Sequence, residues 1–417
     1  MTKSLIIISV LLMSSCSDRE RTNPLDPVNP ETRGAPVGLK IQSNRDSMKL
    51  SWEIMEVNDY TYTEIYKGSS KTDLTYWTTV SANISSINDS GLIYDTPYAY
   101  AVKGITRFSE SKLSDPVMFI PGPVNIWVSD RHNWNLWKIG YDGSHQLFQE
   151  ALIAPSAIEY DSSRQRLWVA KSLEQQIISF ENDTQSYSFS LPGIPVDIAL
   201  DSENQILYVI MQNVNQVKGY DYSGNEVLSV AMDDPFSVSS KIAWDRLSKS
   251  VWTTSPSLDR VYRLSISSSG NKVTVYPSIE NPGPIRADPT TGKIWIGTGT
   301  GIARINKNGD FEIFMEDYFI TDISLHPDTG DCYYTGYSLI HGEWSSGYLP
   351  YAQPEFIQEI LGDEFDFLYK ILVVPGTEAP GVLVQQYSTK KLLRFTGSGI
   401  QIGEMEGFST GLDFVLE

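Results

Sequence analysis

The residues of this chain that are best suited to chemistry lie close together in one short segment. Asp130, Arg131, His132 and Trp134 place a carboxylate, a guanidinium, an imidazole and a large aromatic ring in a single predicted loop. A carboxylate beside a histidine can serve general acid–base catalysis or bind a metal ion. An arginine beside an aromatic ring is instead typical of a protein-binding hot spot. The segment is therefore a candidate for either activity.

Histidine is too scarce to favour a metal-dependent enzyme. The sequence has four histidines, and His145, His326 and His341 fall at a predicted strand edge, in a turn and within a strand. A metal-assisted hydrolase or lyase needs two or three histidine or carboxylate ligands around one ion. The sequence also has no nucleophile-elbow, Walker or zinc-spaced cysteine motif. We therefore predict no catalytic residue, metal or cofactor, and keep an extracytoplasmic hydrolase or lyase as the alternative function.

The amino-terminal residues predict export from the cytoplasm. Lys3 is the only charged residue before residue 18, and it precedes the apolar run of residues 5–13. That run is too short to cross a bilayer, which takes about 20 residues, and is typical of a secretory signal peptide. We place this signal peptide at residues 1–15.

The motif Met13-Ser14-Ser15-Cys16 resembles the lipobox of bacterial lipoproteins. The resemblance implies cleavage before Cys16, lipidation of its thiol and attachment to a membrane of the cell envelope, with Ser17 favouring the outer membrane. Once Cys16 is lipidated, Cys332 is the single free cysteine of the mature chain, which can therefore form no intramolecular disulfide. The proline-rich residues 16–34 predict a semi-extended tether.

The charge composition of the chain limits the classes of macromolecule that it can bind. The chain has 32 basic and 51 acidic residues, a net charge of -19, which excludes nucleic-acid binding through clustered basic side chains. At 41% hydrophobic residues it can bury a substantial core.

Residues 35–120 predict an all-β sandwich, because short runs with alternating apolar and polar residues are separated by polar turns. These runs predict strands at residues 48–53, 62–67, 76–80 and 98–103. Segments 50–52, 95–102 and 110–117 resemble the fibronectin type III family. The resemblance implies that Trp52 fills the core, that Tyr98 forms a tyrosine corner, and that the module is a spacer or an adhesive unit.

Residues 122–417 contain a repeat of four short strands whose second strand is centred on a large residue. The spacing between these anchors runs from 38 to 49 residues. The anchors are Trp127, Trp168, Tyr208, Trp252, Trp295, Tyr333 and Val382. The repeats resemble the NHL and YVTN families, which implies a seven-bladed β-propeller. Residues 412–417 align with the first strand that the first repeat lacks, and we predict that they close the ring.

Aspartates recur at the turn after the first strand of several repeats: Asp161, Asp201, Asp245 and Asp288. A calcium loop would need several oxygen ligands within one loop, whereas a lone aspartate accepts hydrogen bonds from its own turn. We predict structural turns and no metal site.

The predicted ligand-binding face lies on loops between second and third strands. Its candidate residues are Asp130, Arg131, His132, Trp134, Lys171, Gln212, Asn213, Gln386 and Tyr387. Loops between repeats are acidic and would attract cations or basic partners: 233–234, 280, 316–317, 363–364 and 366. We predict a membrane-anchored binding or scaffold protein with a protein or glycan ligand. A hydrolase or lyase and a polysaccharide-binding module stay open as alternatives.

Overall fold

The structure is a computed structural model that describes residues 22–182, 184–212, 214–306, 309–361, 365–376, 380–396 and 399–417. The predicted signal peptide, Cys16 and Asn213 lie outside these residues. The chain divides into two compact units, with the boundary between Pro121 and Gly122. Among the described residues, strands dominate, and no helix is long and apolar enough to cross a membrane.

The first unit consists of two antiparallel sheets. Leu50, Trp52, Ile65 and Tyr100 are buried together in its core. The hydroxyl of Tyr98 accepts a hydrogen bond from the amide of Ile93 at 3.2 Å, which ties the start of its strand to the preceding loop. The strands are β1 (Lys40–Asn44), β2 (Ser47–Ser51) and β5 (Ser86–Ser90) in one sheet, and β4 (Asp73–Ser81), β3 (Tyr60–Ser70), β6 (Tyr98–Thr106) and β7 (Val117–Phe119) in the other.

Residues 22–34 differ from the extended tether that their prolines predicted. They form consecutive turns, in which the Thr32 hydroxyl donates to the carbonyl of Pro24 at 2.7 Å. The carbonyl of Gly34 accepts a hydrogen bond from the amide of Lys112 at 2.7 Å. Asn29 is buried, and its side-chain oxygen accepts the amide hydrogen of Glu31 at 2.8 Å. The asparagine and aspartate side chains therefore stabilise turns that the prolines permit.

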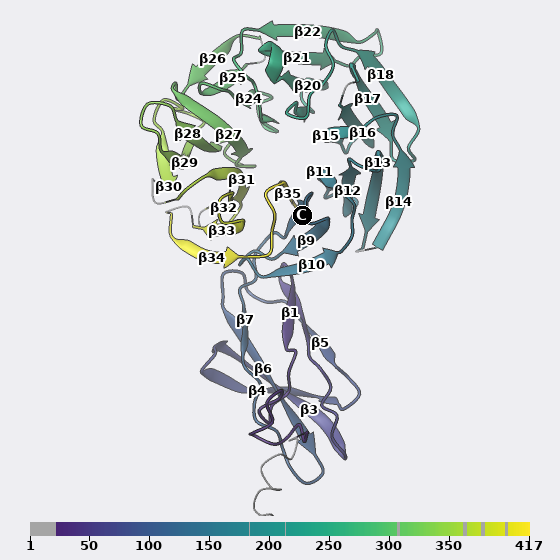
Figure 1. Ribbon diagram of the computed structural model, residues 1–417, viewed down its shortest axis with the longest axis vertical. Helices are drawn as coiled ribbons and strands as arrows, with labels where there is room; N and C mark the ends of the chain where they lie inside the picture. Colours follow the sequence, from purple (N-terminus) through teal and green to yellow (C-terminus); the bar gives the residue numbers. More distant parts are fainter. Residues whose placement is uncertain are drawn as a thin grey trace, which may run out of the picture. The chain divides into compact units, whose positions relative to one another are not determined.

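The described residues of the second unit form seven four-stranded antiparallel sheets that follow one another around a ring (Figure 1). The first three, from the innermost strand outward, are β35 (Leu412–Leu416), β8 (Ile126–Asp130), β9 (Asn135–Ile139) and β10 (His145–Gln149); β11 (Pro155–Asp161), β12 (Arg166–Lys171), β13 (Gln176–Glu181) and β14 (Thr184–Ser190); and β15 (Pro195–Asp201), β16 (Ile206–Met211), β17 (Gln216–Asp221) and β18 (Glu226–Ala231).

The remaining four sheets repeat this pattern. They are β19 (Ile242–Asp245), β20 (Ser250–Ser255), β21 (Arg260–Ser265) and β22 (Lys272–Pro277); β23 (Ile285–Ala287), β24 (Ile294–Gly297), β25 (Ile302–Ile305) and β26 (Phe311–Phe314); β27 (Tyr318–Leu325), β28 (Cys332–Ser338), β29 (Trp344–Leu349) and β30 (Gln358–Leu361); and β31 (Leu368–Val374), β32 (Gly381–Gln386), β33 (Lys391–Phe395) and β34 (Gln401–Met405). All seven predicted anchors lie in the second strand of their sheet and are buried against a neighbouring sheet.

The carboxyl-terminal strand completes the first sheet of the ring, as the sequence predicted. Strand β35 pairs antiparallel with β8, and Phe414 lies opposite Val128. Leu412 and Phe414 are buried with Ile126 and Val128 in one hydrophobic cluster. The innermost strand of the first sheet therefore comes from the far end of the chain, and this pairing closes the ring.

Candidate functional site

The topology places two kinds of loop at the same end of the ring. Loops between second and third strands and loops joining consecutive sheets form what we call the loop end; the opposite end is the turn end. Backbone hydrogen bonds connect the two kinds of loop, from Arg131 to Gly411 at 2.9 Å and from Tyr387 to Phe367 at 2.9 Å. The candidate residues predicted from the sequence lie at this loop end, apart from Asn213, which is outside the described residues.

Asp130 is buried and its carboxylate is fully engaged. It accepts hydrogen bonds from the amide and side chain of Asn133 at 3.0 and 3.1 Å, and from the amide of Ser409 at 2.8 Å. The Ser409 hydroxyl also donates to it. Asp130 therefore joins its own loop to the segment that leads into β35, which is a structural role rather than one in acid–base chemistry.

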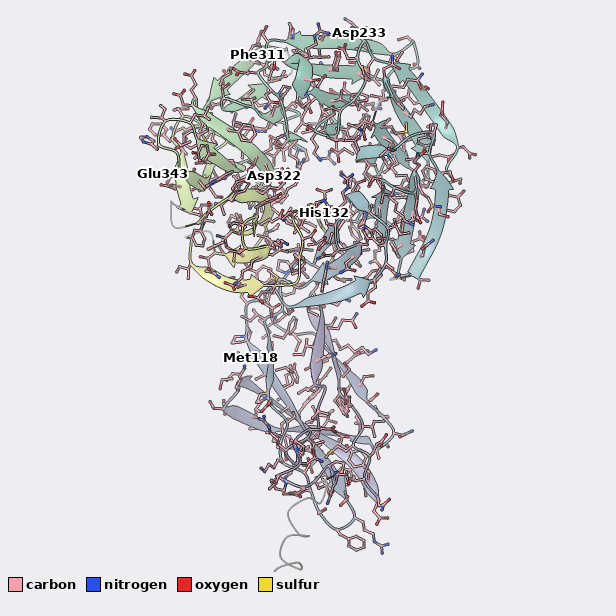
Figure 2. The ribbon with its side chains drawn as sticks, viewed as in Figure 1. Met118, His132, Asp233, Phe311, Asp322 and Glu343 are labelled. Carbon is pink, nitrogen blue, oxygen red and sulfur yellow. The ribbon has the colours of Figure 1, made fainter. Side chains whose placement is uncertain are left out.

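His132 and Arg131 are exposed beside Asp130, and His132 lies on the inner side of the ring in Figure 2. The Nδ1 atom of His132 lies 3.2 Å from the hydroxyl of Thr410. Within the described residues, no group of three or more histidine, cysteine or acidic side chains could hold a metal ion. The described geometry around His132 is thus that of a surface imidazole with one hydroxyl partner.

The other candidates are partly used by their own loops. Lys171 forms an ion pair with Glu174, and burial lowers the pKa of Lys171. The side-chain oxygen of Gln386 accepts a hydrogen bond from Thr389 at 2.8 Å. Tyr387 and Trp134, in contrast, expose 39% and 44% of their surface. These two aromatic side chains are therefore available to a ligand, as are the exposed Arg131 and His132.

Exposed apolar side chains concentrate at the loop end. Of the large hydrophobic residues exposed on the described ring, ten lie there and four at the turn end, the others being on outer strands. The ten are Trp134, Leu173, Val238, Leu258, Phe319, Leu339, Ile340, Phe367, Tyr369 and Tyr387. Contiguous exposed apolar surface on a folded domain usually marks a binding surface.

At the turn end, the recurring aspartates are hydrogen-bonded within their own turns. Asp288 is buried and accepts hydrogen bonds from the amide and hydroxyl of Thr290 at 2.8 and 2.7 Å. Asp161 accepts from the amide of Ser163 at 3.0 Å, and Asp201 from that of Asn204 at 3.1 Å. The prediction that these aspartates stabilise their turns is confirmed.

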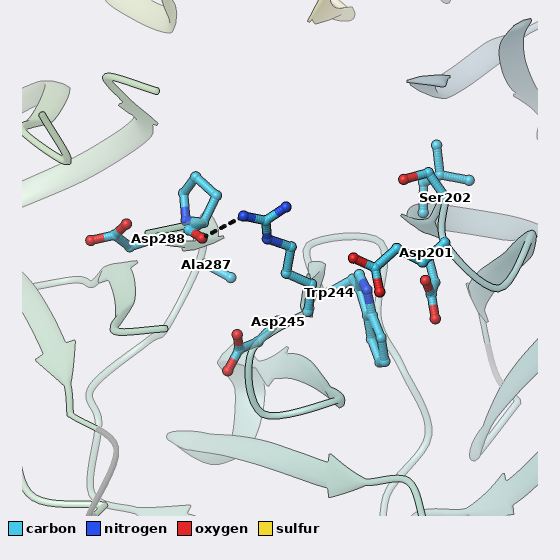
Figure 3. A pocket seen from close by; sticks show the side chains of 10 residues that line it. Asp201, Ser202, Trp244, Asp245, Ala287 and Asp288 are labelled. Atoms are coloured by element: carbon cyan, nitrogen blue, oxygen red, sulfur yellow. Dashed lines mark hydrogen bonds between the residues drawn. The ribbon is translucent and has the colours of Figure 1, made fainter. Parts of the chain in front are cut away.

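A small cavity lies at the turn end between the first turns of three sheets (Figure 3). Its volume of about 220 Å³ is below the range of roughly 300–1,000 Å³ that is usual for ligand pockets. The guanidinium of Arg246 donates to the carbonyl of Pro289 at 3.3 Å across it. Three of its carboxylates, Asp201, Asp245 and Asp288, are the engaged turn residues, so the cavity offers few unused polar groups.

A cluster of charged side chains at the centre of the ring was not anticipated from the sequence. Each of the seven sheets contributes one residue from its innermost strand or the position just before it: Asp413, Glu159, Asp197, Lys241, Arg286, Asp322 and Lys370. Asp322 points toward the middle of the ring in Figure 2. We call these residues the central cluster. The sequence feature that could have revealed this cluster is a charged residue within an otherwise apolar first strand.

Contacts within the central cluster connect neighbouring sheets. Lys370 lies 3.7 Å from Asp322 and 3.8 Å from Asp413. The Asp322 carboxylate also accepts the amide hydrogen of Ile371 at 3.2 Å, from the next sheet. Burial raises the pKa of Glu159 to about 8, outweighing the opposing effect of Arg286. The cluster therefore fastens the innermost strands together and holds at least one carboxyl group that resists ionisation.

The acidic loops are only partly available to a partner. The Asp234 carboxylate accepts hydrogen bonds from Arg260 at 3.0 Å and from Tyr262 at 2.5 Å. Asp233, labelled in Figure 2, is exposed beside it. The exposed carboxylates of the described loops also include Glu280, Glu316, Asp317 and Asp366, whereas residues 363–364 lie outside the described residues.

No family model matches the sequence, and no curated protein does either. Among solved structures, the chain is similar to a protein of unknown function from Desulfotomaculum acetoxidans DSM 771, at 11% identity and a TM-score of 0.56, over 70% of this chain and 99% of that one. A streptogramin B lyase is similar at 13% identity and a TM-score of 0.51, over 70% and 93%. Such identities show the fold alone. The ring of four-stranded sheets is a β-propeller.

Proposed function

We propose that this protein is a lipid-anchored, non-enzymatic binding protein of the bacterial cell envelope. Its propeller binds a protein or glycan ligand at the loop end. The observation that carries this proposal is the uneven distribution of exposed apolar side chains between the two ends of the ring. A surface that keeps exposed aromatic and aliphatic groups without a stability role is best explained by a partner that covers them.

The chemistry of the same face supports binding over hydrolysis. The carboxylate of Asp130 is engaged by Asn133 and Ser409. The described contact of the His132 ring is with the Thr410 hydroxyl. A metal-assisted hydrolase or lyase would need further ligands converging on His132. The structural similarity to a lyase is a similarity of fold and does not alter this balance.

The architecture fits a display function. We infer a fibronectin type III spacer from residues 35–120, supported by the buried Trp52 and by the hydrogen bond of the Tyr98 hydroxyl. We infer a seven-bladed propeller of the NHL or YVTN kind from the seven consecutive sheets. Lipidation at Cys16 would anchor both on a membrane of the envelope, and Ser17 favours the outer membrane. The binding face would then be presented outside the cytoplasm.

The anchor is tested by one substitution. Cys16→Ala is expected to move the protein from the membrane fraction to the soluble fraction, because the lipid is its proposed attachment. Metabolic labelling with a fatty-acid analogue should be lost in the same variant. Membrane association that persists in high salt would contradict the lipid anchor.

The binding face is tested by photo-crosslinking in the native envelope. A photoreactive amino acid is introduced singly at Trp134, Leu339 or Ile340 of the loop end, and at Ser163 or Asp328 of the turn end as controls. We expect crosslinks to another envelope macromolecule from loop-end positions and not from the controls. Crosslinks that arise mainly from the turn end would refute the proposed face.

A further inference from the structure

Among the described residues, six exposed side chains from two neighbouring sheets form the largest apolar group at the loop end. They come from the starts of β27 and β31, from the connections β28–β29 and β32–β33, and from the residue before β31. We call them the aromatic patch: Phe319, Leu339, Ile340, Phe367, Tyr369 and Tyr387. Each exposes between 37% and 68% of its surface.

The exposed rings of the patch are in contact with partly buried aromatic rings beneath them. The Trp344 ring lies 5.2 Å from that of Tyr337 and 4.5 Å from that of Phe367, measured between centroids. Tyr387 lies 5.1 Å from Phe367 and 5.6 Å from Tyr369. Five aromatic rings therefore form one connected series, with the half-buried Trp344 supporting the exposed members. Contacts between aromatic rings stabilise such an arrangement beyond simple burial.

The backbone beneath the patch is fixed by hydrogen bonds. The amide of Tyr387 donates to the backbone carbonyl of Phe367 at 2.9 Å. The amide of Leu339 donates to the backbone carbonyl of Asp317 at 2.8 Å. In the register of β28, Tyr337 lies opposite both Phe319 and Trp344. A preorganised surface loses little conformational entropy when a partner binds. The patch is thus suited to binding as it stands.

The ring angles favour a polypeptide over a sugar chain. Planes of successive rings are inclined by 36° between Trp344 and Phe367, 36° between Phe367 and Tyr387, and 60° between Tyr387 and Tyr369. A flat stacking platform for sugar rings would need nearly coplanar faces. Inclined rings leave recesses into which side chains fit, and the exposed aliphatic Leu339 and Ile340 extend the same surface.

The charges around the patch specify the partner further. The neighbouring loops expose four carboxylates, Glu316, Asp317, Glu343 and Asp366. Of the two lysines nearby, Lys391 is paired with Glu404 and Lys390 is exposed, so the four carboxylates outnumber the exposed cation. An acidic rim around aromatic rings attracts lysine and arginine, whose cations also interact favourably with ring faces.

We propose that the aromatic patch binds a polypeptide segment that combines aromatic or aliphatic anchors with lysine or arginine. This inference rests on the proposed function, because the patch is one part of the loop end. It narrows that function to a polypeptide partner and to two of the seven sheets. The anchors occupy the recesses between the rings, and the basic residues contact the carboxylates of the rim.

The test uses the full-length protein and a random-sequence peptide library displayed on phage. Peptides selected on the wild-type protein are measured against Phe367→Ser/Tyr387→Ser, and against Leu173→Ser/Leu258→Ser, a matched pair at the loop end outside the patch. Glu343→Lys/Asp366→Lys keeps every ring and reverses the charge of the rim. Thermal melting of each variant identifies any that is not folded, and in that case the charge-reversed variant carries the test.

We expect the selected peptides to be rich in basic and aromatic or aliphatic residues. Affinity should fall about tenfold or more in the patch variant. The affinity should also fall in the charge-reversed variant, and there it should depend less on salt concentration. In the matched pair the affinity should stay unchanged. If the matched pair alone loses binding, the loop end binds but the patch inference is wrong. If a glycan array shows patch-dependent binding and no peptide is selected, the polypeptide class is wrong. Peptide binding that survives every loop-end variant would overturn both the inference and the proposed function.

Discussion

The two ends of the propeller use their surface residues in opposite ways. At the turn end, buried aspartates such as Asp161 and Asp288 accept hydrogen bonds from their own turns. At the loop end, Trp134, Ile340 and Tyr387 remain exposed, and their outer surfaces take no part in the core. The difference indicates that the turn end is built for stability and the loop end for contact with something else.

Asp130, like the engaged Asp234, departs from this contrast between the two ends. It lies at the loop end but resembles the turn-end aspartates, because it is buried and engaged by Asn133 and Ser409. Its position explains the exception: it stands where the last segment of the chain joins the first sheet.

The largest effect on stability is expected from removing β35, the strand that closes the ring. Deletion of residues 412–417 removes Leu412 and Phe414 from the core, and each buried side chain contributes roughly 1.5–3 kcal/mol. It also leaves the edge of β8 unpaired, and such edges recruit other chains. We expect a severe loss of propeller stability with aggregation, measured by calorimetry and light scattering. An unchanged melting temperature would show that the ring does not depend on this pairing.

Asp288→Ala tests the turn end directly. Removing the buried carboxylate leaves the Thr290 amide and hydroxyl without this hydrogen-bond acceptor. We therefore expect the free energy of unfolding to fall by about 1–3 kcal/mol. Although burial raises the pKa of Asp288, hydrogen bonds from Thr291 and Thr290 outweigh this effect and lower it. The stabilisation is therefore present at neutral pH and is lost as the pH falls through the folded-state pKa.

The control for this variant is Asp328→Ala, which changes an exposed aspartate at the turn end. Urea unfolding at neutral and acid pH should separate the two variants at neutral pH and bring Asp288→Ala closer to wild type in acid. Ligand binding should be unaffected in both. Equal stability of the two variants at neutral pH would contradict the role assigned to Asp288.

Glu159→Gln probes the central cluster, which belongs to neither end. Burial raises the pKa of Glu159 from 4.5 to about 8, so the folded protein keeps a proton that the unfolded chain releases in this range. The Glu159 contribution therefore makes the wild-type protein less stable as the pH rises from about 5 to about 8. In the variant this slope should be shallower by up to about 1.4 kcal/mol per pH unit. Parallel stability curves for the two proteins would refute a protonated Glu159.

The smallest effect on stability is expected at the loop end. Ile340→Ser changes a side chain that is 68% exposed, and such surface changes usually alter stability by less than about 0.5 kcal/mol. The same variant is expected to weaken ligand binding. A clear fall in its melting temperature would mean that Ile340 is part of the core, and the contrast between the two ends would disappear.

Much of the fold could be predicted from local patterns. Anchors such as Trp168 and Trp295 mark the second strand of each sheet because one large residue must fill the space between neighbouring sheets. The pairing of residues 412–416 with β8 was predictable because the first repeat lacks its own first strand. Turn aspartates were recognisable because their hydrogen-bond partners are only two or three residues away.

The sequence by itself determined the elements, their repeat and the end of the ring on which the candidate residues lie, because these depend on interactions between residues close in sequence. Only the tertiary structure decided that Asp130 is engaged by Ser409, 279 positions away. It also decided that Lys370 meets Asp322 and Asp413 at the centre, and that Phe367 and Tyr387 join one series of rings. These contacts exist because ring closure brings distant strands together. Whether a polar residue is used up or available is fixed by those distant partners, and the spacing of residues along one chain does not specify them.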